Sequence, residues 1–330
     1  MSQQDTRELL ALAGGRTIGL AFRIWGYGEG PALVGLLACS DILNDPRYER
    51  AVVTLVEPYL QREPLPEDHV APAELLVALR HRHGDDRYLE AARRWAQLVL
   101  QAPRPAAGQP QVYRPDLFGL ANVAWVDTMY SHGPGLAACG YPEEGLAVMA
   151  ESCRFLQDDS GLFAHGYDVV SRRTNGVHWG RGCGWALLGI VQISAYLQDA
   201  ALTAACSALL AALASCEEEG RWHTVVDNPS TPLENSVSAF VAAGICLGIR
   251  RGVVAKQYAE LAGRARAAAV ASLIDGDLPV SEATPAGNPD LYATRRLGRF
   301  PWGQGPLLLA LAAEEGWALP AEPSVQGSFR

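Results

Sequence analysis

Two kinds of helical segment alternate along most of the chain. One kind is mostly apolar, which predicts helices that are buried on nearly all sides. Six segments are of this kind: 31–43, 71–82, 128–139, 186–196, 237–249 and 306–313.

The segments that follow them are amphipathic or rich in alanine. In residues 47–61 the apolar positions recur at helical spacing. Two of these segments open with the same pattern, Asp45-Pro46-Arg47-Tyr48 and Asp85-Asp86-Arg87-Tyr88. We predict outer helices over 47–61, 89–101, from Tyr141 onward, 200–215 and 255–273, and a first helix over 7–18 that is interrupted or ends near Gly14-Gly15.

Each apolar segment is preceded by a short entrance that carries aromatic, acidic or basic residues. The entrances lie near residues 25, 68, 127, 181, 236 and 302. Long connections at 103–122, 158–178, 216–233 and 275–301 lead into four of them, and loops of this length in a compact domain are usually functional or disordered. Six helical hairpins whose inner helices open at one end predict an all-α (α/α)6 barrel, with residues 1–330 forming a single domain.

Charge and composition exclude several functions. The net charge of −9 and only 27 Lys and Arg residues argue against a nucleic-acid surface. The seven cysteines are scattered without a Cys-x-x-Cys pair, and no His-x-x-x-His spacing occurs, so neither a metal site nor another cofactor is expected. The polar start of the chain lacks a secretion signal, and we expect a cytoplasmic protein with no membrane association.

The entrance at residues 179–185, Trp-Gly-Arg-Gly-Cys-Gly-Trp, is the most distinctive segment. Its three glycines remove side chains that would keep a ligand from the backbone. Trp179 and Trp185 can stack on sugar rings or pack in a core, and Arg181 offers a planar fork suited to a carboxylate. A glycine-rich helix start held by two core tryptophans is the simpler interpretation of the segment alone.

Asp127 is the candidate acid, because it begins an apolar helix beside Trp125 in a stretch with few other charges. Asp68 stands at the corresponding entrance of another hairpin. Taken alone, each fits an N-cap aspartate better than a catalytic residue. At one barrel mouth, however, the two would form a carboxylate pair that shares a proton, and both are candidate catalytic residues.

Further candidates for substrate contact come from the other entrances and loops. His165 lies in a loop between glycines, where a core histidine is less expected. Trp125 and Tyr27 are candidates for substrate contact, and His178 fits a supporting position beside Trp179. Trp25, Tyr27 and Trp302 fit the barrel core as well as a sugar subsite.

Taken together, these motifs resemble the unsaturated glycuronyl hydrolases, and most of all the unsaturated rhamnogalacturonyl hydrolase branch (glycoside hydrolase families 105 and 88). The resemblance rests on Asp68-His69, Trp125-Val126-Asp127, the stretch from Gly161 to Tyr167, Trp179 to Trp185, and Trp302-Gly303-x-Gly305. It implies an (α/α)6 barrel and an oligosaccharide that ends in a 4,5-unsaturated uronic acid.

The resemblance also implies roles for individual residues. Asp127 matches the acid/base position and Asp68 its partner carboxylate, while His165, Trp179, Arg181 and Trp185 match positions that hold the unsaturated ring. The implied reaction is hydration of the C4=C5 bond followed by release of the sugar. A glycosidase for saturated uronic acids and a non-catalytic sugar-binding relative are the alternatives. A monomer or homodimer is expected, and the leaving sugar stays open.

Overall fold

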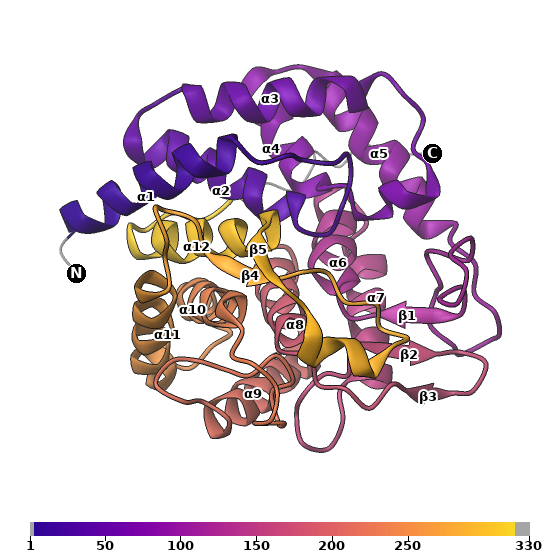
Figure 1. Ribbon diagram of the computed structural model, residues 1–330. Coiled ribbons are helices and arrows are strands. Elements are labelled where there is room, and N and C mark those ends of the chain that lie inside the picture. The colour runs from indigo at the N-terminus through magenta and orange to yellow at the C-terminus, as the bar shows by residue number, and fades with distance from the viewer. Residues whose placement is uncertain (1–2, 321–330) are drawn as a thin grey trace.

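The computed structural model describes residues 3–320, and these form a ring of six inner helices surrounded by six outer ones (Figure 1). The inner helices are α2 (Glu29–Leu43), α4 (Ala73–His83), α6 (Thr128–Ala138), α8 (Gly180–Ile193), α10 (Asn235–Arg250) and α12 (Pro301–Glu314). The outer helices are α1 (Gln3–Ile18), α3 (Arg47–Leu60), α5 (Asp86–Leu100), α7 (Pro142–Leu156), α9 (Ala200–Ser215) and α11 (Ala259–Ala271).

The ring of inner helices is closed. Each inner helix packs on the next, and α12 returns to pack on α2. Each outer helix lies against the inner helix of its own hairpin, with α1 completing the pair of α12. The chain is therefore an (α/α)6 barrel, as the alternation of apolar and amphipathic segments predicts.

Glycines let the inner helices approach one another closely. A Cβ atom on Gly189 of α8 would lie 2.2 Å from the backbone oxygen of Met129 in α6, and one on Gly305 of α12 would lie 2.5 Å from the backbone nitrogen of Ala32 in α2. Any larger residue would force these helix pairs apart. Every residue of α8 is buried, which fits its almost entirely apolar sequence.

The repeated Asp-x-Arg-Tyr pattern begins outer helices, as expected. The backbone N–H of Arg47 donates to Asp45 Oδ1, and that of Arg87 donates to Asp85 Oδ1, both at 3.0 Å. These contacts satisfy free amides in the first helical turn.

The prediction of a break near Gly14-Gly15 is wrong, since α1 runs through both glycines. Gly14 faces Tyr48 and Cys39, so a residue without a side chain lets α1 lie close to its neighbours.

Several short elements were not predicted, and residues 256–258, expected within the outer helix 255–273, form one of them. The short elements are the strands β1 (Val123–Trp125), β2 (Gly166–Asp168), β3 (Arg173–Thr174), β4 (Pro279–Ser281) and β5 (Leu297–Arg299), and the 3-10 helices η1 (Pro66–Val70), η2 (Lys256–Tyr258) and η3 (Pro289–Thr294). β1, β2 and β3 form one antiparallel sheet, and β4 pairs with β5. The segment between β4 and β5 reaches across to the β1–β2 sheet (Figure 1), where the side-chain amide of Asn175 donates to the backbone oxygen of Ala286.

Candidate active site

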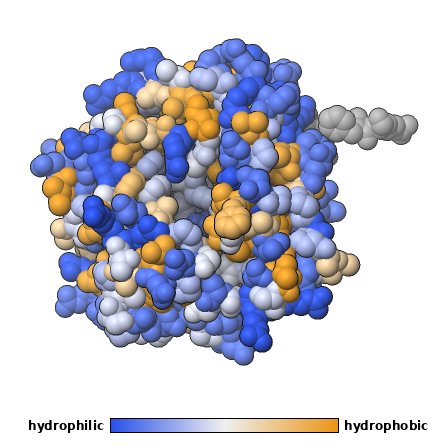
Figure 2. All heavy atoms as spheres, turned by 45° about the vertical axis from the view of Figure 1, so that its right-hand side comes forward, coloured by the Kyte–Doolittle hydropathy of each residue, from blue (hydrophilic) through white to orange (hydrophobic). Residues whose placement is uncertain are grey.

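A cavity of about 270 Å³ opens where the loops meet the inner-helix starts. Figure 2 shows a face of the molecule that is hollowed near its centre, with apolar residues at the edge of the hollow. The cavity is lined by Arg23, Tyr27, Leu117, Leu120, Trp125, Asp127, His165, Trp179, Arg181, Trp185, 283–286, Arg295 and Trp302. Seven of the eight site residues proposed from the sequence are in this set, and the eighth, Asp68, is not.

The short sheet explains why Asp127 and His165 meet. Trp125 of β1 pairs with Gly166 of β2, and the N–H of Val126 donates to the backbone oxygen of His165 at 3.0 Å. Asp127 is the next residue and immediately precedes α6. His165 Nε2 lies 3.1 Å from Asp127 Oδ2, and both side chains are almost completely buried.

A chain of hydrogen bonds continues behind His165. Its Nδ1 contacts the hydroxyl of Tyr292, which accepts a hydrogen bond from Asn175 Nδ2 at 3.3 Å. One arrangement of protons satisfies all these contacts: Tyr292 donates to Nδ1, and His165 donates from Nε2 to Asp127. Oδ2 of Asp127 then accepts the hydrogen bond from His165, and Oδ1 is the oxygen that can carry a proton.

Aromatic rings form the walls around this carboxylate. The imidazole of His165 lies 4.2 Å from the ring of Trp179, and Tyr27 lies 5.9 Å from Trp125. Burial raises the pKa of Tyr27 well above its ordinary value, so its hydroxyl stays neutral. Tyr27 Oη and the indole N–H groups of Trp125, Trp179 and Trp185 are buried without a hydrogen-bond partner among residues 3–320. Four unpaired polar groups around one cavity favour a ligand rich in hydroxyl groups.

The structure corrects the role predicted for the three glycines of the 179–185 segment. A Cβ on Gly180, Gly182 or Gly184 would come within 2.8 Å of Val237, Val126 or Phe240 respectively. These glycines therefore allow α8 to pack against its neighbours, and they do not clear space for a ligand.

Arg181 is not the free carboxylate-binding fork that the sequence suggested. It is 1% exposed, and its guanidinium lies 4.5 Å from the Trp179 ring. Nη2 donates to the backbone oxygen of Glu282 at 3.0 Å, and Nη1 contacts Glu234 Oε1 and Ser236 Oγ at 3.4 Å. Burial lowers the pKa of Arg181, while Glu234 and Asp127 raise it. Its contacts hold α8, α10 and the β4 loop together beneath Trp179.

The predicted pairing of Asp68 with Asp127 is not formed. Asp68 is completely buried in η1, where Arg62 Nη1 and Nη2 contact its two carboxylate oxygens at 2.5 and 2.8 Å. The backbone N–H of Leu65 also donates to Oδ2 at 2.7 Å. Both oxygens are occupied by a bidentate ion pair and a helix-start contact, so Asp68 is a structural residue. It is at the third position of η1, where it caps the N–H of Leu65, and not at the N-cap of α4 that the simpler interpretation predicts.

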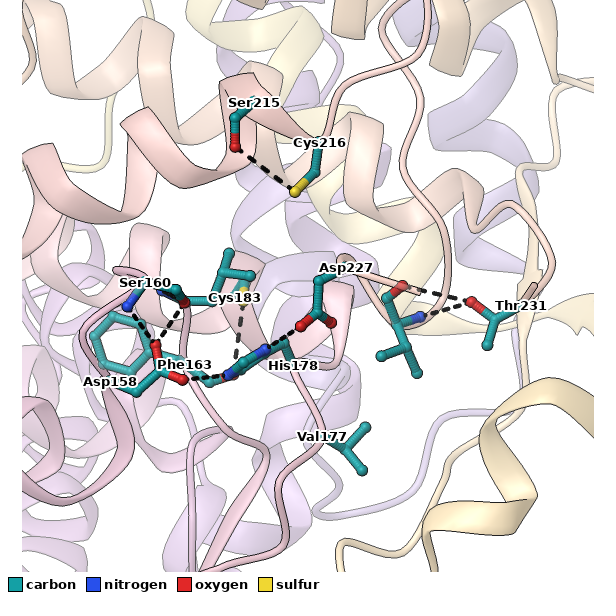
Figure 3. Close-up of polar contacts among 12 residues, drawn as sticks. Asp158, Ser160, Phe163, Val177, His178, Cys183, Ser215, Cys216, Asp227 and Thr231 are labelled. Carbon is teal, nitrogen blue, oxygen red and sulfur yellow. Dashed lines mark hydrogen bonds and ion pairs between the residues drawn. The ribbon is translucent and has the colours of Figure 1, made fainter. Parts of the chain in front are cut away.

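His178 lies outside the cavity and ties two loops together behind Trp179. Its Nε2 lies 2.8 Å from Asp158 Oδ2, and its Nδ1 lies 2.8 Å from Asp227 Oδ2. Figure 3 shows the imidazole between these two carboxylates. The backbone oxygen of His178 also accepts from the N–H of Val226. We call Asp158, His178 and Asp227 the loop clamp.

Sequence reasoning missed Tyr292, Arg23 and Arg295. Tyr292 and Arg295 lie in a connection of irregular structure with no periodic pattern to mark it, and Arg23 precedes its entrance motif.

Among residues 3–320, no group of three or more His, Cys, Asp or Glu side chains is placed to hold a metal ion. The same part of the chain has no helix long and apolar enough to cross a membrane, and all seven of its cysteines are free thiols.

Comparisons with known proteins agree with this architecture. The chain is 28% identical over 316 residues to the unsaturated rhamnogalacturonyl hydrolase YesR of Bacillus subtilis (strain 168), covering 87% of this chain and 89% of that protein. A possible GH105 member from Salmonella enterica serovar Paratyphi A has a TM-score of 0.86 at 22% identity, covering 95% and 94% of the two chains. The unsaturated glucuronyl hydrolase of Bacillus sp. GL1 has a TM-score of 0.71 at 16% identity, covering 94% and 96%.

These two structural similarities support the fold only. The family assignment comes from the sequence. Residues 17–315, most of the chain, match the sequence profile of Glycosyl Hydrolase Family 88. The chain therefore belongs to glycosyl hydrolase family 88 and is a glycoside hydrolase of the unsaturated uronyl hydrolase group.

Proposed function

We propose that the protein removes a terminal 4,5-unsaturated uronic acid from oligosaccharides that polysaccharide lyases produce. The family membership and the aromatic cavity around Asp127 support this activity. A rhamnogalacturonan fragment is the proposed substrate, because the relative YesR is named for that activity.

Asp127 is the proposed catalytic acid. It is the one carboxylate among the described residues that line the cavity, and this observation carries the proposal. The unsaturated ring is a vinyl ether, so a proton from Asp127 Oδ1 can add to C4 and leave positive charge shared by C5 and the ring oxygen. His165 donates to Oδ2 and stabilises the carboxylate that forms when the proton leaves.

Water then adds to C5, and Asp127 takes up one proton from it. The product is a hemiketal, whose C5–ring-oxygen bond breaks to give a ketone at C5 and a hemiacetal at C1. The hemiacetal releases the leaving sugar with a free hydroxyl. One water is consumed, and Asp127 regains its proton, so no second carboxylate is required. Asp68 has no role in these steps.

The cavity walls supply binding and orientation. Trp125, Trp179 and Trp185 offer flat apolar faces, and Tyr27 offers a neutral hydroxyl. These groups exclude water from most of the ring, which strengthens the electrostatic interactions at Asp127.

The test is a spectrophotometric assay on the unsaturated galacturonyl-rhamnose disaccharide that a rhamnogalacturonan lyase releases. Hydration removes the ultraviolet absorbance of the C4=C5–carboxylate system, so wild-type protein should abolish it and Asp127→Asn should not. The saturated disaccharide is the control and should stay intact. Cleavage of the saturated disaccharide at a similar rate would instead support a glycosidase for saturated uronic acids.

A further inference from the structure

An acidic substrate requires a cation in the cavity, and three arginines line it: Arg23, Arg181 and Arg295. They differ in burial and in the hydrogen-bond and ion-pair partners that the protein gives to each guanidinium group. Arg181 is 1% exposed and bound to Glu234 and the backbone of Glu282, so its guanidinium has little capacity left for a ligand.

Arg23 is exposed to solvent and lies near Glu29. A Cβ on Gly26 would lie 2.7 Å from Glu29 Oε2 and 3.3 Å from Arg23 Nη2, so the ends of both side chains lie near this glycine. Burial raises the pKa of Glu29, and the Arg23 charge acts in the opposite direction. Glu29 is 1% exposed, and its Oε2 is buried without a hydrogen-bond partner among the described residues, so the Arg23 guanidinium acts on it only through its charge.

Arg295 lines the cavity and differs from both others, because it is partly buried and has a buried donor without a partner among the described residues. Its side chain is 22% exposed, its Nη1 lies 3.9 Å from Glu282 Oε2, and Nε is buried without a hydrogen-bond partner in the described part of the chain. A single ion pair at that distance leaves most of the guanidinium's five donors unused.

The position of Arg295 relative to the acid is also informative. It directly follows η3 and stands three residues after Tyr292, at a position where the backbone is extended. Tyr292 contacts His165, which holds Asp127. One short segment thus carries Tyr292, which supports the acid through His165, and Arg295, a cation that lines the same cavity and has a buried donor without a partner in the described part of the chain.

From this arrangement we infer that Arg295 binds the carboxylate of the unsaturated uronic acid and determines specificity for an acidic terminal sugar. This inference rests on the proposed function. The guanidinium and the carboxylate would form charge-assisted hydrogen bonds. Because the carboxylate is attached to C5, holding it at Arg295 fixes the neighbouring C4 relative to Asp127.

The experiment compares Arg295→Gln with Arg296→Gln on the unsaturated disaccharide and on its methyl ester. Arg296 is the matched control, since it is the adjacent arginine, is exposed and does not line the cavity. We expect Arg295→Gln to raise KM for the acid roughly ten- to hundredfold and to leave KM for the ester near the wild-type value. Arg295→Lys should recover part of the loss, and Arg296→Gln should have no effect.

A binding measurement separates this inference from the proposed function. Calorimetric titration of the unsaturated disaccharide into Asp127→Asn and into Asp127→Asn/Arg295→Gln needs no turnover. Weaker binding only in the double variant supports the inference, even if the wild-type protein fails to consume the double bond. Equal binding in the two proteins, or loss of acid-over-ester preference in Arg23→Gln instead of Arg295→Gln, would overturn it.

Discussion

His165 Nε2 lies 3.1 Å from Asp127 Oδ2, although 38 residues separate them in the chain. The pairing of β1 with β2 brings them together, and Tyr292 contacts the other side of the imidazole from a third segment. In this arrangement His165 donates from Nε2 to Asp127, which orients the carboxyl group and stabilises its anion.

Replacing His165 by Ala should lower kcat by roughly ten- to a hundredfold, which corresponds to the loss of one hydrogen bond to a charged group. KM should change less, because Trp179 and Arg295 remain. Steady-state kinetics on the unsaturated disaccharide measure both constants. A His165→Ala variant with wild-type kcat would show that Asp127 needs no partner.

Tyr292→Phe should have a smaller effect on kcat, of roughly three- to tenfold, because it removes a neutral hydrogen bond to His165. The ring still packs in the same place. Tyr292→Phe in the His165→Ala background should add almost nothing, since the hydroxyl acts through the imidazole. Full additivity in this double-mutant cycle would contradict the hydrogen-bond chain.

The loop clamp should stabilise the position of Trp179, which forms part of the cavity wall. His178→Ala leaves Asp158 and Asp227 facing each other without the imidazole between them. We expect a loss of about 1–3 kcal/mol in the free energy of unfolding and faster amide hydrogen exchange in the loops around residues 158–161 and 225–228. Unchanged exchange in both loops would mean that the clamp does not hold them.

Glu74 should make stability depend on pH. Its Oε1 accepts a hydrogen bond from the Tyr196 hydroxyl at 3.2 Å, and burial raises the pKa of Glu74 from 4.5 to about 7. The folded state then binds this proton more tightly than the unfolded state. The free energy of unfolding should therefore fall as pH rises from 4.5 to 7, by an amount on the order of 1–3 kcal/mol.

Glu74→Gln tests this pH dependence, because the amide cannot ionise. Chemical denaturation at pH 4.5 and pH 7 should show a difference between the two pH values that is smaller in Glu74→Gln than in wild type. The same difference in both proteins would assign the pH dependence to other groups.

The barrel could be predicted from sequence because the inner and outer helices differ in composition along their whole length. Asp127, His165 and the tryptophans could be placed at one site because their motifs begin helices or lie in glycine-bounded loops. Asp68 and Arg181 show the limit of this reasoning. A capping aspartate and a catalytic one occupy the same position in sequence, and only the contacts with Arg62 distinguish them. The burial of Arg181 depends on Glu234 and Glu282, which lie in other loops.

Tyr292 and Arg295 could not be found from sequence. They act through one irregular segment that crosses to the sheet of another hairpin, and no periodicity or motif marks such a contact. The same holds for β1 and β2, whose three-residue pairing is too short to produce an alternating pattern.

The central claim is that Asp127 protonates C4 and that water adds to C5, and isotope labelling tests it most directly. The reaction of the unsaturated disaccharide is run once in deuterium oxide and once in ¹⁸O-labelled water, and the early products are analysed by NMR and mass spectrometry. We predict deuterium at C4 of the released uronic acid, ¹⁸O at C5, and no label in the leaving sugar. Deuterium absent from C4, with ¹⁸O entering at C1 and the double bond retained, would contradict the account.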